Sequence, residues 1–173
     1  MVQRIFFVIV FMLSNVGNSL LALACAMEGP SPRAEISVAP NAPKDRPIST
    51  TGYEMTKLEE AIKPYLEKAK ETYPDAKRRY LAGLQPSDIF FVTTKLQDAD
   101  GNGEQVFVRV SRIRKNTIYG TIASQILLVS GYANGDEYKF PESNLVDWVF
   151  AKPDGTEEGN FVGKFLDEYQ DQR

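Results

Sequence analysis

The chain has 173 residues, of which 43% are hydrophobic and 25% charged, and its formal net charge is −3. This balance is typical of a globular protein with room for one domain, and the lack of a long basic run disfavours binding to nucleic acid. With no histidine and a single cysteine, the chain cannot form a Ser-His-Asp or Cys-His catalytic site, a histidine-containing zinc site or an intrachain disulfide. We expect no cofactor.

The first 24 residues have the order of a secretory signal peptide. Arg4 supplies a positive charge near the start, and residues 5–13 form an unbroken apolar run. A short polar stretch follows, and then Ala22 and Ala24 provide the small residues of a cleavage site. This succession of a charged start, an apolar core and small residues predicts a signal peptide over residues 1–24.

Cys25 follows that cleavage site at once, and the segment LALAC resembles a bacterial lipobox. In a lipobox the cysteine is acylated and becomes the new N-terminus, although Ala22 stands here where leucine is preferred. The resemblance predicts a protein held to a membrane by lipid on Cys25, either on the outer face of the cytoplasmic membrane or in the outer membrane facing the periplasm. Ala26 in the next position favours the outer membrane. Two alternatives stay open: plain cleavage, and an uncleaved anchor over residues 5–24.

Residues 25–50 have the composition of a tether, because prolines are frequent there and apolar residues are few. Such a segment cannot bury a core and is expected to be extended. Residues 51–173 are then predicted to form a single folded domain, large enough to bury a core without disulfides.

The domain is predicted to begin with a helix. Thr51 and Glu54 have the spacing of a capping box, and apolar residues then recur at helical spacing, at Met55, Leu58, Ile62, Leu66 and Ala69. Pro64 is expected to kink or restart the helix because it lacks an amide donor. A further helical segment is expected over residues 74–84. Its basic run at residues 77–79 is interpreted as a solvated face.

After Pro86 the pattern changes to short β-rich stretches bounded by turn residues. Five strands are predicted, over residues 88–96, 104–113, 116–123, 135–141 and 145–152. A short helix is expected to end the chain, with Phe161, Phe165 and Leu166 facing inward. A helix or kinked helix pair, a meander of strands and a final helix together predict an α+β fold with an antiparallel sheet.

The stretch QDADGNGE, residues 97–104, has two interpretations. Asp98, Asp100 and Asn102 match the first ligand positions of a calcium loop. The twelfth position of that loop, however, is Arg109, which is cationic and cannot be a ligand. Asp, Asn and Gly are also the residues that a tight strand connection requires. We therefore predict a hairpin tip and keep a metal site at Asp98, Asp100 and Asn102 as the weaker alternative.

The second half of the chain resembles the YegJ-like proteins, a bacterial family of unknown function. The resemblance rests on Glu104 with the VFVRV that follows, on GTIAS (120–124), on GYANGDEYKFPESNLVDWVF (131–150) and on DGTEEGNFVGKFL (154–166). It extends over about residues 53–169, nearly the whole predicted domain. It implies an α+β fold and an envelope or secreted protein, but no reaction and no known site.

Asp136, Asp147, Trp148 and Asn160 belong to these motifs and form our candidate binding surface. Each also has a structural interpretation. Asp136 follows a glycine in a turn, Asp147 is suited to capping a helix or pairing with an arginine, and Trp148, the only tryptophan, is suited to core packing. Asn160 is a candidate N-cap, and the acidic residues 157–158 are expected near the start of the last helix, where acids favour the helix dipole.

Three functions remain open at this point. The first is a non-catalytic protein-interaction module bound to an envelope protein. The second is a hydrolase that uses carboxylates alone, with candidates Asp136, Asp147, Glu157 and Glu158. The third is a small-ligand-binding domain, with a pocket walled by Tyr119, Tyr132, Tyr138 and Trp148. The absence of a recognisable catalytic constellation favours the first.

Overall fold

The computed structural model describes residues 6–11, 45–48 and 52–171, and their side chains from residue 56 to residue 171. Strand β1 (Phe6–Phe11) pairs in parallel with β2 (Asp45–Ile48) and antiparallel with the start of β4. Cys25, the expected cleavage site and Thr51 of the expected capping box lie outside the described residues. None of the described helices is long and apolar enough to cross a membrane.

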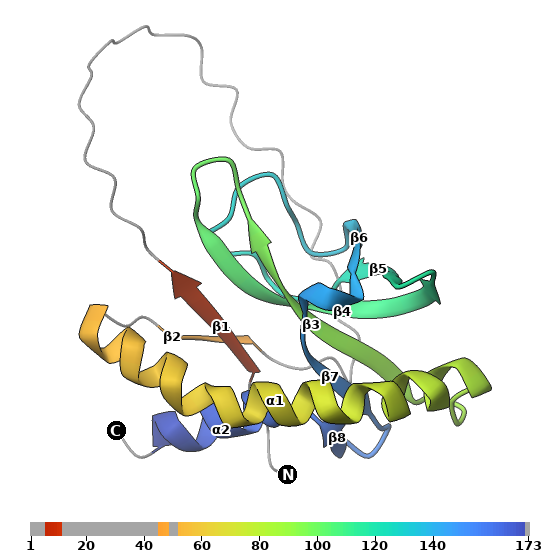
Figure 1. Cartoon of the computed structure of the whole chain (residues 1–173). Coiled ribbons are helices and arrows are strands. Elements are labelled where there is room, and N and C mark those ends of the chain that lie inside the picture. The colour runs from red at the N-terminus through yellow and green to blue at the C-terminus, as the bar shows by residue number, and fades with distance from the viewer. Residues whose placement is uncertain (1–5, 12–44, 49–51, 172–173) are drawn as a thin grey trace, which may run out of the picture.

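The predicted α+β fold is confirmed (Figure 1). Strands β3 to β8 form an antiparallel sheet in the order β6-β5-β4-β3-β7-β8, with α1 and α2 lying beside one another. The elements are α1 (Gly52–Ala82), β3 (Ile89–Gln97), β4 (Gly103–Arg114), β5 (Thr117–Ile122), β6 (Glu137–Pro141), the 3₁₀ helix η1 (Glu142–Asn144), β7 (Leu145–Ala151), β8 (Glu157–Gly159) and α2 (Phe161–Asp171).

Helix α1 is a single helix, which is one of the two predicted alternatives, and the separate segment expected over residues 74–84 is wrong. Proline removes one backbone hydrogen bond to the carbonyl four residues earlier. Pro64 and Pro74 are both exposed, as are Glu60 and Lys70, whose carbonyls lose their partners. Because water can satisfy those carbonyls, the helix continues through both prolines.

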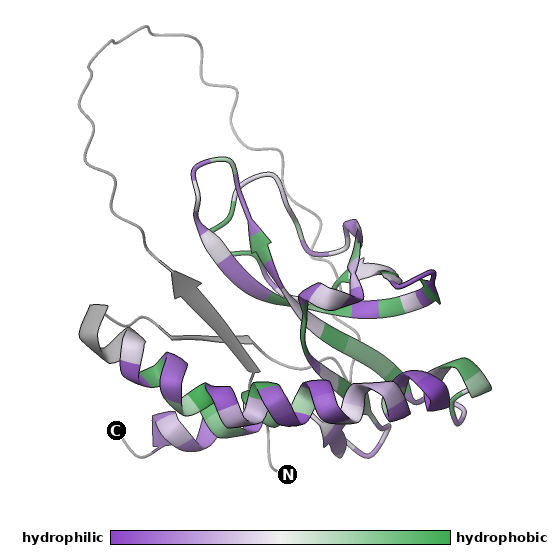
Figure 2. Cartoon of the chain, in the orientation of Figure 1, coloured by the Kyte–Doolittle hydropathy of each residue, from purple (hydrophilic) through white to green (hydrophobic). Residues whose placement is uncertain are grey.

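The buried side of α1 follows the predicted stripe and continues beyond it. Leu58 and Ile62 pack against Val162 and Leu166 of α2 in one cluster. The second half of the helix contributes Tyr73 and other residues to the main core, which the sheet builds from β3, β4, β5, β6 and β7. Figure 2 shows the resulting contrast between the alternating hydropathy of α1 and the largely hydrophobic β3 and β7.

Strand β8 was not predicted: Glu157 and Glu158 lie in this strand and not at the start of the last helix. Gly159 ends β8 with φ +80°, and a Cβ there would collide with the carbonyl oxygen and ring of Trp148. Glycine is therefore required where the end of β8 approaches its neighbouring strand β7. Asn160 follows with φ 55° and places the chain at the start of α2. The Gly-Asn pair thus forms the link from β8 to α2.

Candidate functional site

An open groove lies between the second half of α1, the β7–β8 hairpin and the start of α2. Its volume is about 740 Å³, and we call it the α1–β8 groove. It is lined by Glu71, Thr72, Asp75 and Arg79 of α1, by Trp148 and Lys152, by Thr156, Glu157, Glu158 and Gly159, and by Phe161 and Lys164. Charged side chains of both signs surround the aromatic ring of Trp148 at the floor of the groove. Such a lining is typical of a polar binding surface.

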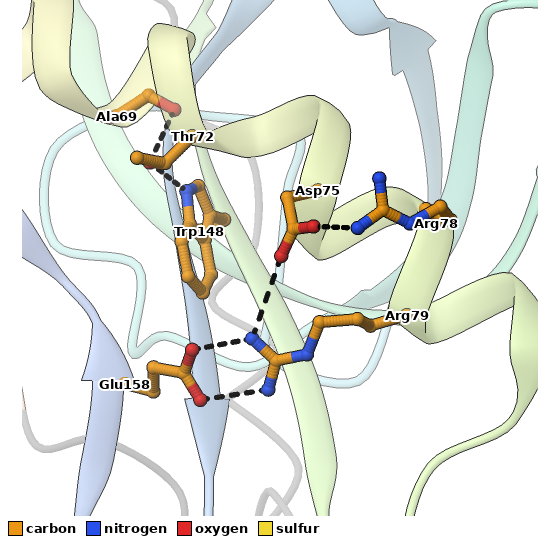
Figure 3. Close-up of polar contacts among 7 residues, drawn as sticks. All are labelled: Ala69, Thr72, Asp75, Arg78, Arg79, Trp148 and Glu158. Atoms are coloured by element: carbon orange, nitrogen blue, oxygen red, sulfur yellow. Dashed lines mark hydrogen bonds and ion pairs between the residues drawn. The ribbon is translucent and has the colours of Figure 1, made fainter.

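Trp148 forms the floor of the groove and is held firmly in place. Only 4% of its surface is exposed, and its Nε1 donates a hydrogen bond of 3.0 Å to Oγ1 of Thr72 on α1 (Figure 3). Thr72 in turn donates to the carbonyl of Lys68 at 2.7 Å. The rings of Phe150 and Phe161 pack edge-on against the indole, with centroids 5.5 and 5.8 Å away. The indole therefore belongs mainly to the core.

Arg79 and Glu158 form a bidentate ion pair across one side of the groove (Figure 3). The two guanidinium nitrogens lie 2.5 and 2.8 Å from the two carboxylate oxygens, and the guanidinium also lies 4.7 Å from the centre of the Phe150 ring. The hydrogen bonds from Arg79 lower the pKa of Glu158, and those to Glu158 raise the pKa of Arg79. Both side chains stay charged and partly exposed, available to a partner.

Lys164 of α2 closes the outer edge of β8. Its Nζ donates hydrogen bonds to the carbonyls of Gly159 at 2.7 Å and Glu157 at 3.2 Å. The carbonyls of an uncovered edge strand can accept hydrogen bonds from a strand of another chain. Because the lysine occupies both, a partner in the groove would contact side chains and would not extend the sheet at β8.

Asp147 lies next to Trp148 in sequence but inside the protein, with 1% of its surface exposed. Its two oxygens accept hydrogen bonds of 2.7 Å from the backbone amides of Trp148 and Val162. Val162 is in the first turn of α2, so Asp147 caps that helix from another element. Burial raises the pKa of Asp147 to about 7, against the lowering effect of these hydrogen bonds. The capping role that we considered for this residue is the one observed.

The four residues of the candidate binding surface do not form one surface. Asp147 and Asn160 are interior, at 1% and 2% exposure, because one caps α2 and the other turns the chain into it. Asp136 is exposed on the loop before β6, where it accepts a 2.8 Å hydrogen bond from the amide of Ala133. Only Trp148 lines the α1–β8 groove. The lining of that groove therefore replaces this set as the candidate site.

The loop from residue 98 to 102 is a hairpin tip between β3 and β4, as predicted. The carboxylate of Asp98 accepts hydrogen bonds from the amides of Asp100 and Asn102 at 3.0 and 2.9 Å, from the Asn102 side chain at 3.0 Å and from the amide of Ser130 at 3.1 Å. The Asn102 hydrogen bond contributes most to lowering the pKa of Asp98. Its oxygens thus have donors in the places a cation would take, and no group of three Asp, Glu, His or Cys side chains suited to a metal ion is present in the described residues.

Glu104 is a buried anchor that the sequence analysis did not identify. Its side chain is 0% exposed, and its carboxylate accepts hydrogen bonds from three successive amides, those of Leu127 at 3.0 Å, Leu128 at 2.9 Å and Val129 at 3.2 Å. The contacts span more than twenty residues of chain. Glu104 and Asp98 together tie the loop between β5 and β6 to the β3–β4 hairpin.

Glu104→Gln should loosen that loop. Glutamine keeps the shape but loses the charge and turns an amide donor toward amide donors, so we expect a loss of about 1–3 kcal/mol in the free energy of unfolding. Hydrogen exchange should accelerate at the amides of residues 127–129. Glu137→Gln, at an exposed position, is the control. Equal exchange in the two variants would show that the carboxylate does not hold the loop.

The other two candidate functions receive little support from these positions. The four carboxylates considered for a hydrolase are already engaged: Asp136 in its turn, Asp147 at the cap of α2, Glu157 with the side chain of Asn160 and Glu158 with Arg79. The four aromatic residues considered for a pocket are also divided. Tyr119 and Tyr138 border a hollow on β5 and β6, whereas Trp148 borders the α1–β8 groove.

Residues 57–172 match the family described as "Uncharacterized protein conserved in bacteria (DUF2314)". The match runs from within α1 to the end of α2 and confirms the expected membership in a bacterial family of unknown function. Comparison with curated proteins and with solved structures finds no match.

Proposed function

We propose that this chain, which belongs to the uncharacterized bacterial family DUF2314, is an envelope lipoprotein whose domain binds another protein through the α1–β8 groove. The observation that carries the proposal is the Arg79–Glu158 pair, which is charged, bidentate and partly exposed beside an apolar floor. An arginine held over an aromatic ring at the rim of a groove is a recurring contact residue of protein interfaces.

Binding is favoured over catalysis because Arg79, Glu158 and Lys164 of the groove already hold one another or the backbone in place. Arg79 and Glu158 hold each other, and Lys164 holds the edge of β8. Asp147, whose pKa burial raises to about 7, has its oxygens occupied by backbone amides in the interior. A general acid or base must reach its substrate with a free proton-transfer position, and these groups are arranged for recognition instead.

Export and lipid attachment are the parts of the proposal that rest on the sequence of residues 1–25. Cys25→Ser should abolish acylation and leave an unprocessed precursor in the native host. The measurement is the size of the protein and its incorporation of labelled fatty acid, with wild type beside it. A variant that is processed normally and stays on the membrane would contradict lipid attachment at Cys25.

The partner should be lost when the groove arginine is removed. We expect crosslinking and membrane solubilisation of the tagged full-length protein to recover a stoichiometric protein with wild type, and about tenfold less with Arg79→Ala, as for a hot-spot residue. Arg78→Ala is the matched control, because Arg78 is the neighbouring arginine and does not line the groove. Full recovery with Arg79→Ala, or equal loss with both variants, would contradict binding in the groove.

A further inference from the structure

A second charged surface lies on the outer face of β4, β5 and β6. Arg109, Arg112 and Arg114 of β4 and Lys139 of β6 are all exposed there. Arg112 and Lys139 both pair in register with Tyr119 of β5, which places the three side chains in a row across the strands. Arg112, Tyr119 and Lys139 line a hollow of about 750 Å³ together with Ser111, Gly120, Thr121, Glu137 and Tyr138. We call this surface the basic face.

A break in strand register brings the arginines together. Side chains on a regular strand alternate between the two faces, so residues 109 and 112 would point to opposite sides. The pairing of β4 with β5 shifts between Val110 and Arg112. Arg109 then lies opposite Thr121 and Arg112 opposite Tyr119, two positions apart on β5 and therefore on one face. Bulges commonly redirect a side chain in this way near functional surfaces.

The four basic side chains of this face outnumber the acidic Glu137, which lies among them. Some basic residues elsewhere are paired, such as Lys77 with Glu142 and Arg79 with Glu158. No ion pair among the described residues involves Arg109, Arg112, Arg114 or Lys139. Arg112 instead lies over the ring of Tyr119, 4.3 Å from its centre. The net charge of the whole chain is −3, so the local excess of basic side chains on this face is opposite in sign to the charge of the whole chain.

We propose that the basic face docks the domain onto an anionic membrane surface. The inference rests on the proposed export and lipid attachment. Residues 25–50 would then hold the domain close to a bilayer, where weak contacts become significant through a high effective concentration. Several basic residues in one plane are attracted by anionic headgroups, and a tyrosine among them is suited to the interface, because its ring is amphipathic.

Docking by this face leaves the α1–β8 groove open. Strands β6 and β8 stand at opposite ends of the order β6-β5-β4-β3-β7-β8. The basic face lies at the β6 end, and the groove is bordered by β8. The domain would rest on the membrane by one end of its sheet and present the groove away from that contact.

A fluorophore at the centre of the basic face tests the proposal. The full-length chain with Cys25→Ser has no other cysteine, so Thr121→Cys gives a single labelled position between Arg109 and Glu137. Glu67→Cys, exposed on α1, is the control label. With vesicles containing phosphatidylglycerol and a headgroup quencher, we expect quenching at residue 121 but not at residue 67. Vesicles of phosphatidylcholine alone should give neither, and added salt should reverse the effect.

Charge reversal separates this face from general electrostatic attraction. Arg112→Glu with Lys139→Glu should weaken the anionic-vesicle signal by roughly tenfold or more. Lys63→Glu with Lys70→Glu makes the same change of charge at exposed positions on α1 and should leave the signal unchanged.

Equal quenching at both labels, or equal loss in both double variants, would overturn the proposal. A signal that depends on protein concentration without vesicles would assign the face to a second copy and also overturn it. None of these results depends on the Arg79 and Cys25 experiments, so the proposals can fail separately.

Discussion

The free energy of unfolding should decrease by about 4 kcal/mol between about pH 4 and about pH 7, because Asp147 becomes costly to ionise in the folded protein. Burial raises its pKa from 3.8 to about 7. Between those values the folded state binds more protons than the unfolded state, so stability falls as the pH rises. Below the lower value both states are protonated, and above the higher value both are ionised. The difference of about three pKa units corresponds to about 4 kcal/mol.

Histidine does not contribute to the pH dependence in this window. The chain has no histidine, the side chain that ordinarily titrates between pH 5 and 8. Asp98, Asp154 and Glu158 have lowered pKa values. Groups of this kind stabilise the folded state above their unfolded pKa and lose that contribution as the pH falls. Their effect therefore falls at the acid end of the window and below it, and has the opposite sign.

Asp147→Asn assigns the effect to this one carboxyl group. The variant has no titrating group at the position, so its stability should be nearly constant from about pH 4 to about pH 8 in urea unfolding experiments. Asp136→Asn, at an exposed turn, should retain the decrease seen in wild type. A parallel decrease in Asp147→Asn and wild type would show that Asp147 has an ordinary pKa, with the amides of Trp148 and Val162 outweighing its burial.

Features of the fold that depend on local pattern were predictable from the sequence. Val106, Val108 and Val110 alternate along β4 and are buried on one side of it, as a strand period of two requires. The connection rich in Asp, Asn and Gly predicted the hairpin tip, because the side chains of such residues form hydrogen bonds to the nearby backbone. The two prolines of α1 were misleading. Whether a proline interrupts a helix depends on whether water can reach the carbonyl that loses its hydrogen-bond donor, and this is a property of the tertiary structure.

The candidate site was less predictable because its contacts join distant parts of the chain. Thr72 and Trp148 are separated by 76 residues, and Arg79 and Glu158 by 79. Neither pair has a local signal, since a threonine or an arginine on a helix is ordinarily solvated. Glu104 was recognised as part of a family motif, but its three amide donors come from a loop without regular structure. Such long-range polar contacts require the fold to be known.

Trp148→Ala should cost about 3–5 kcal/mol of folding free energy, the usual range for removal of a large buried aromatic side chain. The indole contacts the rings of Phe150 and Phe161 and donates to Thr72, so the substitution leaves a cavity between α1 and β7. Trp148→Phe keeps most of that packing and loses the hydrogen bond, and we expect a cost of about 1 kcal/mol from the bond alone. Urea unfolding followed by circular dichroism measures both.

The same variants decide whether Trp148 acts as a core residue or as a contact residue. Leu127→Ala, at a position 50% exposed, is the control and should change stability by less than about 0.5 kcal/mol. If Trp148 acts through the core, Trp148→Phe should still recover the partner, because the Arg79–Glu158 pair remains in place. Loss of the partner with Trp148→Phe at unchanged stability would instead make the indole a direct contact. The partner would then reach the floor of the α1–β8 groove as well as its charged rim.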